Sequence, residues 1–363
     1  MNHELKTSTA SIETQSSKKT KHIKHLKILA TVLTVLGIAL FAYFVYSVGV
    51  WEIIFGIGRI GFDGFALILL IYFLRIACRA TAWRLSVSEP YKLNFSDTLP
   101  AVIIGEALSS LIPLGILISG TSKAFAVRKQ VPMVVGLSSV ATENLFYSLV
   151  TGLFIAFGAF AFVKNFELPS VWILTIDLLI FLVLFLIVFA LAAVIRQWHI
   201  LSSLCSWLYN RHVGRGVLED GRQQVRMFED FIFGFYRKYP ERFLPIFLIQ
   251  TVFHALGVLE VWFILSRLSE TIPSLNSAFL LESVSRVITI VFKLVPFLIG
   301  VDEAGAQFVA EILGLAAGIG VTLAIIRKGR ILFWTAVGMI LILKREISLL
   351  EILQHREEAD SGQ

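Results

Sequence analysis

The chain has 363 residues, of which 56% are hydrophobic and only 16% charged, with a formal net charge of +6. Soluble domains carry about 25% charged residues, so this composition excludes both an ordinary soluble enzyme and a disordered polar chain. Two cysteines also exclude a disulfide scaffold. Most of the excess positive charge lies before or between apolar segments, which is typical of orientation signals in a membrane protein and not of nucleic-acid binding.

The N-terminal residues are rich in Ser, Thr and Lys and end in a basic run. We predict that residues 1–27 form a disordered, basic, cytoplasmic arm. Residues 28–50 then continue without a charge. They are long enough to cross about 30 Å of hydrocarbon, whereas the apolar region of a signal peptide has roughly 7–15 residues. This segment is therefore predicted to be a retained membrane span.

Four further segments are long and apolar enough to cross a bilayer, namely residues 62–85, 131–163, 170–195 and 243–266. If the N-terminal arm is cytoplasmic, the loop of residues 196–242 is cytoplasmic as well. That loop contains eight Arg or Lys against five Asp or Glu, in agreement with the positive-inside rule. Charges within residues 219–230 recur at i,i+4 spacings, which favours a helix on the membrane surface.

Residues 99–120 are apolar enough to cross, but a basic loop follows them. A complete crossing would place that loop outside, against the charge rule. Pro removes a helix donor and Gly permits unusual dihedral angles, so a helix would break at Pro113 and Gly115. We predict a re-entrant hairpin that turns back there.

Residues 277–317 repeat this pattern, with Pro296 and Gly300 separating two apolar pieces. Two full crossings and a second hairpin both remain open, because either would start the last apolar segment, residues 321–343, on the same side. That segment would return the chain to the cytoplasm, where residues 346–363 form a tail.

A weak internal similarity relates residues 110–125 to residues 293–308. Paired interrupted segments in the two halves of a transporter point to its binding site, because broken helices supply free backbone groups near mid-membrane. The match is short and needs a gap, so chance similarity is an equal alternative.

Several ionisable residues fall inside apolar segments, where each costs about 2.5–3.5 kcal/mol on insertion scales unless it faces a cavity or a partner. Glu282, Arg286 and Lys293 lie within about 40° of one another on a helix, and so form one polar stripe. Arg75 and Arg79 are also one turn apart and repel each other unless an anion lies between them. We expect these side chains to face the protein interior.

Arg327, Lys328 and Arg330 lie in the outer half of the last apolar segment, which conflicts with the positive-inside rule. The conflict disappears if they face a polar interior. A structural ion pair with a lysine that reaches the membrane surface remains the alternative for the charged stripe.

One local motif resembles an anion-binding nest, namely Ser119, Gly120, Thr121, Ser122 and Lys123. Good helix formers follow it from Ala124, so the Ser and Thr residues are expected to cap a helix whose free amides, with the lysine, attract an anion. Gly300 and Glu303 are expected to cap a helix that begins near Ala304 in the same way. An ordinary helix cap is the alternative for the first motif.

Four features occur together along the chain: an Arg-rich end of the second span (residues 75–84), a Pro/Gly segment followed by a basic residue (113–123), an acid at Glu143, and the motif Pro296, Gly300, Val301, Glu303. In this combination the chain resembles, over residues 28–343, the flippase-like transmembrane family named after lysylphosphatidylglycerol synthase. That family includes hopanoid-associated and archaeal glycan-lipid members. A basic residue in its final segment would correspond to Arg327 or Arg330.

The chain departs from the family pattern at two places. It has Phe297 and Leu298 where the family commonly has a Gly pair, and the segment 119–123 where the family has an Arg. Synthase members also carry a large soluble aminoacyl-transfer domain, but only 20 residues follow Leu343 here. The resemblance therefore implies the membrane part without that enzyme.

We predict an all-α polytopic protein of the plasma (inner) membrane, with about 6–8 transmembrane helices, one or two re-entrant or broken helix pairs and both termini cytoplasmic. The transmembrane domain would cover residues 28–345. No metal, cofactor or nucleic acid is expected to bind, and no nucleotide-binding motif is present in the sequence, so movement of a lipid would be passive or driven by a gradient.

The predicted function is a lipid flippase whose cationic intramembrane cavity binds the headgroup of an anionic phospholipid or of an isoprenoid-linked or hopanoid-type lipid. The predicted headgroup residues are Arg75, Arg79, Ser119, Gly120, Thr121, Ser122, Lys123, Arg286, Lys293, Arg327 and Arg330, with Glu143, Glu282 and Glu303 holding the arginines in place. Two alternatives remain, an intramembrane enzyme with Glu303 or Glu143 as general base and an accessory scaffold for a lipid-modifying complex. No catalytic constellation is recognised, and homo-oligomerisation is left open.

Overall fold

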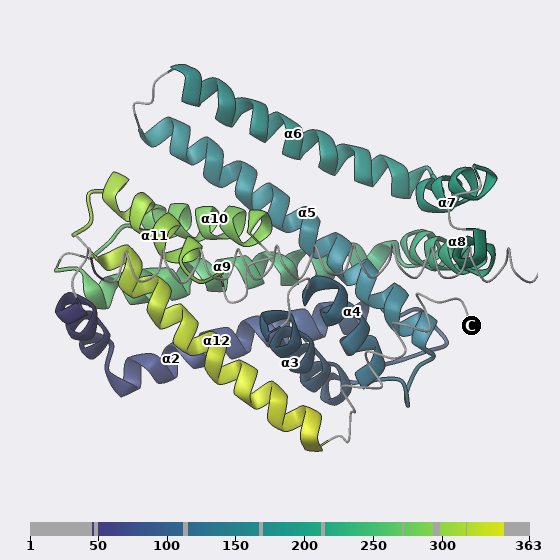
Figure 1. Cartoon of the computed structure of the whole chain (residues 1–363), viewed down its shortest axis with the longest axis horizontal. Helices are drawn as coiled ribbons and strands as arrows, with labels where there is room; N and C mark the ends of the chain where they lie inside the picture. Colours follow the sequence, from purple (N-terminus) through teal and green to yellow (C-terminus); the bar gives the residue numbers. More distant parts are fainter. Residues whose placement is uncertain are drawn as a thin grey trace, which may run out of the picture.

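The computed structural model of the protein describes Tyr46 and residues 50–344, except residues 112–114, 167–169, 212–214, 271, 293–297 and 317. All regular structure in these residues is helical (Figure 1). In chain order the helices are α2 (Val50–Leu85), α3 (Phe95–Leu111), α4 (Gly115–Ala126), α5 (Met133–Asn165), α6 (Ser170–Ile195), α7 (Ile200–Asn210), α8 (Arg215–Lys238), η1 (Pro240–Arg242), α9 (Phe243–Leu268), α10 (Leu275–Val291), α11 (Val301–Ile312) and α12 (Ile319–Lys344).

Four helical stretches in the described part of the chain are long and apolar enough to cross a membrane: Ile57–Leu85, Met133–Asn165, Ile173–Ile195 and Pro240–Leu268. They coincide with the four spans predicted after the first one. The predicted last span corresponds to α12. The predicted arm, tail and, apart from Tyr46 and Val50, first span lie outside the described residues. The expected all-helical, polytopic membrane fold is confirmed.

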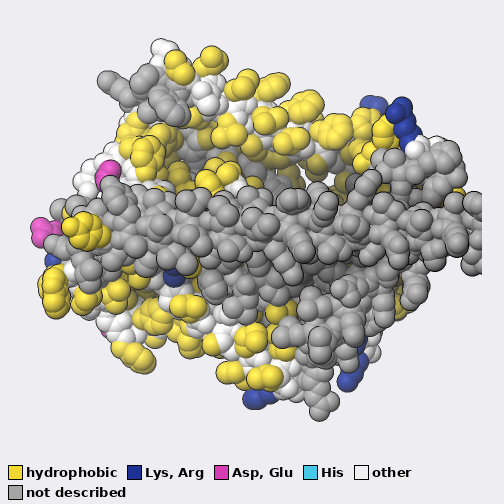
Figure 2. Space-filling view, in the orientation of Figure 1, with side chains coloured by type: hydrophobic (Ala, Val, Ile, Leu, Met, Phe, Trp, Pro, Cys, Tyr) yellow, Lys and Arg dark blue, Asp and Glu magenta, His cyan; other side chains and the backbone are white. Residues whose placement is uncertain are grey.

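Helix α6 shows most clearly that the surroundings are apolar. Leu174, Phe181 and Val188 expose 70%, 68% and 64% of their surfaces. Figure 2 shows hydrophobic side chains gathered over this helix, with Lys and Arg side chains near the end where it passes into α7. Apolar surface on this scale would be unfavourable in water, so α6 is a lipid-facing helix.

The first predicted re-entrant segment is a pair of short antiparallel helices, α3 and α4, that pack side by side. They approach so closely that a Cβ atom on Gly105 would lie 2.8 Å from Cγ of Lys123 and 3.1 Å from the carbonyl oxygen of Ser119. The predicted break at Pro113 lies outside the described residues, and Gly115 is the first residue of α4. At 12 residues α4 is roughly 18 Å long, too short to cross a bilayer.

The second interrupted segment, α10 and α11, is also a helical hairpin. A Cβ atom on Gly305 would overlap the side chain of Ile288, which places the two helices in direct contact near the turn. Because α11 also has only 12 residues, or roughly 18 Å, it is too short to cross a bilayer, which favours the hairpin over two full crossings. Lys293 and Pro296 lie outside the described residues.

Gly300 precedes α11 with φ of 82°, a conformation that favours glycine, and its amide donates to Glu303 Oε2 at 2.8 Å. The helix begins at Val301, three residues before the predicted start near Ala304. The side chain of Glu303 still caps it, as predicted.

Helices α2 and α9 form an antiparallel pair at the centre of the molecule. Near one end Arg59 Nη1 donates to the carbonyl of Leu268 at 2.8 Å, and near the other end Arg242 Nη1 donates to the carbonyl of Leu85 at 3.4 Å. Figure 1 shows α3 and α4 nearer the end occupied by α7 and α8, called here the α8 end, and α10 and α11 nearer the opposite end.

The segments α2–α5 and α9–α12 repeat one arrangement in opposite orientations. Each consists of a long helix, a hairpin of a 17-residue and a 12-residue helix, and a second long helix. The packing is reciprocal, since α3 contacts α12 while α10 contacts α5. Because α2 and α9 are antiparallel, the two hairpins enter the bundle from opposite ends. This is the arrangement of an inverted repeat.

Candidate functional site

Four arginines and two glutamates meet beside the α2–α9 pair, and we call this group the central cluster: Arg75, Arg286, Arg327, Arg330, Glu260 and Glu282. Its members come from α2, α9, α10 and α12, so they belong to both halves of the repeat. Both glutamates are fully buried, and the most exposed arginine side chain, that of Arg286, is 11% exposed.

Arg75 links the two glutamates. Its Nη1 donates to Glu260 Oε2 at 3.2 Å, and its Nη2 donates to Glu282 Oε1 at 3.4 Å. Its guanidinium also lies over the ring of Phe253, with Cζ 4.5 Å from the ring centroid. The ring of Tyr72 lies on it as well, at 5.7 Å, so the deepest arginine is held by two carboxylates and two aromatic rings.

Glu282 is shared by three arginines. Besides Arg75, it accepts from Arg286 Nε at 2.9 Å and from Arg327 Nη2 at 2.8 Å. The approach of this carboxylate depends on Gly257, because a Cβ atom there would overlap Glu282 Oε1 and lie 3.2 Å from Cζ of Arg75. The predicted pairing of Glu282 with Arg286 is present, as is the predicted inward direction of Arg327.

Glu260 holds the fourth arginine, Arg330, by a short ion pair. The guanidinium of Arg330 stacks over Tyr72, 4.0 Å from the ring centroid. Glu260 lies in an apolar span where an unpaired carboxylate would be costly. The residues predicted from the sequence to form the site do not include this acid, although a lone acid in a span is itself a signal for a buried partner.

The central cluster carries more positive than negative charge. Four arginines against two glutamates give 4 − 2 = +2, and the nearby Asp302, which acts electrostatically on Arg327, reduces this excess to +1. The Nε atoms of Arg75 and Arg330 are buried without a hydrogen-bond acceptor. The cluster therefore has spare positive charge and spare donors at a depth where both are unfavourable.

A second group lies next to it, towards α4, and we call it the α4-side cluster: Arg79, Lys123, Glu106 and Glu143. Arg79 binds Glu143 through two hydrogen bonds, Nε to Oε1 at 3.1 Å and Nη2 to Oε2 at 3.0 Å. Lys123 is 2% exposed and lies close enough to act on Glu143. Here two cations and two carboxylates balance.

Tyr72 connects the two clusters. Its hydroxyl donates to Glu106 Oε2 at 3.0 Å while its ring lies under Arg330. Neither Tyr72 nor Glu106 was predicted as a site residue, and no periodic pattern in the sequence distinguishes them. Arg75 and Arg79, which would repel each other as neighbours on one helix, belong to different clusters and bind different glutamates.

A third pair involves Glu303 and Lys328, which form a short ion pair across α11 and α12. Glu303 is fully buried and was predicted to hold an arginine. The partner is a lysine because Lys328 lies on the side of α12 that faces the start of α11. Arg327 and Arg330 contact α10 and α9 instead.

The prediction that residues 119–123 form an anion-binding nest of free backbone amides is wrong. The helix that was expected to begin near Ala124 begins at Gly115, so Ser119, Gly120, Thr121 and Ser122 lie within α4. Their amides are inside a helix and are not free at its start. The apolar residues 115–118 continue the helix towards the turn, and the Ser and Thr residues do not interrupt it.

Residues 28–338 match the family model described as the lysylphosphatidylglycerol synthase TM region. The chain belongs to this family. The comparisons with curated proteins and with solved structures gave no match. As a member of the family, the chain is a multi-pass membrane protein that acts on lipids, and the clusters described above are its buried polar residues.

Proposed function

We propose that the protein is a lipid translocase in which the central cluster binds the anionic headgroup of a membrane lipid. The observation that carries the proposal is the surplus of positive charge among Arg75, Arg286, Arg327 and Arg330. Buried charges in membrane segments normally have partners, so a surplus at this depth favours an anionic ligand.

The donor count supports the same ligand. Each arginine offers about five N–H donors and each carboxylate about four acceptor positions, so four arginines exceed the capacity of two glutamates. A phosphate group has several acceptor oxygens. It would accept hydrogen bonds from Arg286 and Arg327, since a guanidinium group binds phosphate through paired N–H···O bonds. The acyl or isoprenoid chains would stay in the bilayer.

The inverted repeat supports translocation over simple binding. In transporters with such repeats the substrate binds near the bilayer midplane, at the interface of the two halves and beside interrupted helices. The central cluster is formed by residues of both halves, and two helical hairpins flank it from opposite ends. Movement of one half against the other would expose the cluster to each side in turn.

Glu260 and Glu282 would hold the arginines in place while no lipid is bound. An arriving phosphate would then compete with these carboxylates for the guanidinium groups. We assign the coupling of lipid movement to an ion gradient to the buried pair of Glu303 and Lys328, because Lys328 directly follows Arg327 of the central cluster on α12.

The test is translocation of fluorescent phosphatidylglycerol and of a fluorescent polyprenyl phosphate in proteoliposomes. We expect Arg286→Gln combined with Arg327→Gln to slow movement of at least one of them about tenfold or more, because each charge-assisted contact contributes about 1.5–3 kcal/mol. Arg226→Gln, an exposed substitution on α8, is the matched control.

Equal rates for wild type and the double variant with both lipids would overturn the proposal. A covalently altered lipid, detected by mass spectrometry after the same incubation, would instead favour an intramembrane enzyme.

A further inference from the structure

Helices α5 and α6 are in close contact at one level and separate towards the α8 end. The contact is at Gly152, where a Cβ atom would lie 2.9 Å from Cδ1 of Ile187 and 3.5 Å from Cγ1 of Val183. Beyond it, α5 and α6 diverge (Figure 1), and a cavity of about 640 Å³ lies between them and the beginning of α9. We call this cavity the α5–α6 groove.

The α5–α6 groove is apolar over almost its whole lining, with Leu149, Ala190 and Phe247 on its three walls. Along α6 it extends from Val183 to Ile195, which is twelve residue steps or roughly 18 Å of helix. Half of a hydrocarbon core of about 30 Å is about 15 Å. The groove is therefore as long as one leaflet is thick, and it runs from mid-membrane to the α8 end.

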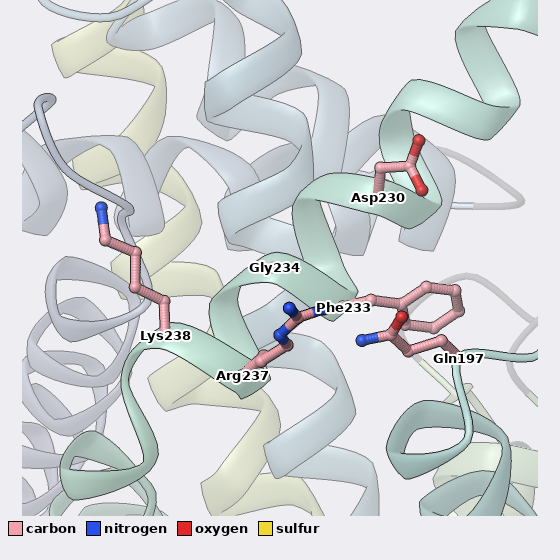
Figure 3. A pocket seen from close by; sticks show the side chains of 6 residues that line it. All are labelled: Gln197, Asp230, Phe233, Gly234, Arg237 and Lys238. Atoms are coloured by element: carbon pink, nitrogen blue, oxygen red, sulfur yellow. The ribbon is translucent and has the colours of Figure 1, made fainter.

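A polar hollow of about 470 Å³ adjoins the groove where α6 ends, lined by Gln197, Asp230, Phe233, Gly234, Arg237 and Lys238 (Figure 3). The two cavities are lined by neighbouring residues of the chain, because Ile195 and Tyr236 line the first while Gln197 and Arg237 line the second. Figure 3 shows the guanidinium of Arg237 and the amide of Gln197 facing one another, whereas Lys238 points away.

The charges of this hollow favour an anion at Arg237. Asp230 is already engaged, since His199 Nε2 lies 2.9 Å from its Oδ1. Arg237 forms no ion pair with any carboxylate in the described part of the chain. An apolar groove one leaflet long that ends at an available guanidinium is complementary in shape and polarity to a phospholipid with an anionic headgroup.

We propose that the α5–α6 groove and the adjoining hollow bind one anionic phospholipid from the leaflet at the α8 end, the leaflet that the charge distribution predicts to be cytoplasmic. An acyl chain fills the groove, and the phosphate accepts hydrogen bonds from Arg237. The groove alone, at about 640 Å³, lies within the range of about 300–1,000 Å³ that is typical of small-molecule sites.

This site is distinct from the central cluster. Glu143 and Tyr147 of α5 face Arg79 and the polar interior, whereas Leu149 and Gly152 line the groove on the other side of the same helix. The proposal therefore stands or falls independently of translocation by the central cluster.

The experiment is photolabelling of the full chain in phosphatidylcholine vesicles that contain phosphatidylglycerol with a diazirine in one acyl chain, followed by peptide mapping. Adducts should concentrate on the groove-lining residues of α5 and α6, and unlabelled phosphatidylglycerol should compete better than added phosphatidylcholine. Ala190→Trp fills the groove and should lower this labelling about tenfold. Val188→Trp, on the exposed surface of α6, should not.

Arg237→Glu should abolish the preference for phosphatidylglycerol, a change of about tenfold in competition, whereas Arg226→Glu on the same helix should preserve it. Labelling spread evenly over α6 and equal in Ala190→Trp and Val188→Trp would overturn the groove. Equal competition by both lipids in the wild type would overturn the role of Arg237. The double variant Arg286→Gln with Arg327→Gln should keep the groove labelling, which separates this result from a failure of the translocase proposal.

Discussion

The two halves of the repeat have the same arrangement of helices. In each half an ion pair joins the first helix to the last, and we call this contact the joint; the basic and acidic partners are exchanged between the two joints. Between α2 and α5, Arg79 of the first helix binds Glu143 of the last helix. Between α9 and α12, Glu260 of the first helix binds Arg330 of the last helix. An inverted repeat therefore does not create two equal binding sites here. The fold places an ion pair at each joint, and the residues around each joint decide whether the charge is balanced.

That difference separates a structural cluster from a candidate binding cluster. The α4-side cluster sums to zero, whereas the central cluster has a surplus because Arg75, Arg286 and Arg327 gather around one carboxylate, that of Glu282. We expect the first to respond to substitution mainly in stability and the second in lipid binding as well.

The largest loss of stability is expected on substitution of Glu282, the carboxylate that three arginines share. Glu282→Gln leaves three buried arginines without their shared acid, and breaking a buried ion pair costs about 3–5 kcal/mol. The thermal unfolding midpoint of the purified protein in detergent should fall strongly. Arg226→Gln, an exposed substitution on α8, is the control, and an unchanged midpoint for Glu282→Gln would contradict the assigned network.

A charge reversal at the first joint tests the comparison itself. Arg79→Glu and Glu143→Arg should each destabilise the protein, and together they should recreate the polarity of the α9–α12 joint. Coupling between contacting residues is typically about 0.5–3 kcal/mol, so the double variant should be more stable than the sum of the single effects predicts. Additive effects in a denaturation series would show that the two side chains are not coupled.

A smaller loss of stability is expected on substitution of Tyr72, which connects the two clusters. Tyr72→Phe keeps the ring under Arg330 but removes the hydrogen bond to the Glu106 carboxylate, a loss of about 1.5–3 kcal/mol. Tyr72→Leu removes the ring as well and should cost more. Equal unfolding midpoints for the two variants would show that the ring does not stabilise the guanidinium.

The sequence predicts the parts of this fold that depend on local pattern. Long apolar segments predict the spans, and Pro and Gly within residues 99–120 predict the first hairpin. Glu282 and Arg286 are one helical turn apart, so their pairing is also predictable. These features need only neighbours along the chain.

The parts that depend on packing are not predictable in this way. Arg75 and Glu260 are 185 positions apart, and only the antiparallel packing of α2 and α9 brings them together. The start of α4 was misplaced because Ser and Thr favour helix caps but are also tolerated inside a helix, and the apolar residues before them are already helical. Tyr72 has a role only because Glu106 and Arg330 approach it from two other helices.

Direct binding of a lipid headgroup to the central cluster is the decisive measurement. Native mass spectrometry of the full chain with equal amounts of phosphatidylglycerol and phosphatidylcholine should show preferential retention of the anionic lipid, with Ala190→Trp used throughout to remove the groove site. Adding Arg286→Gln and Arg327→Gln should abolish that preference. Retention of the same preference after both arginines are neutralised would contradict the claim that their surplus charge binds the lipid.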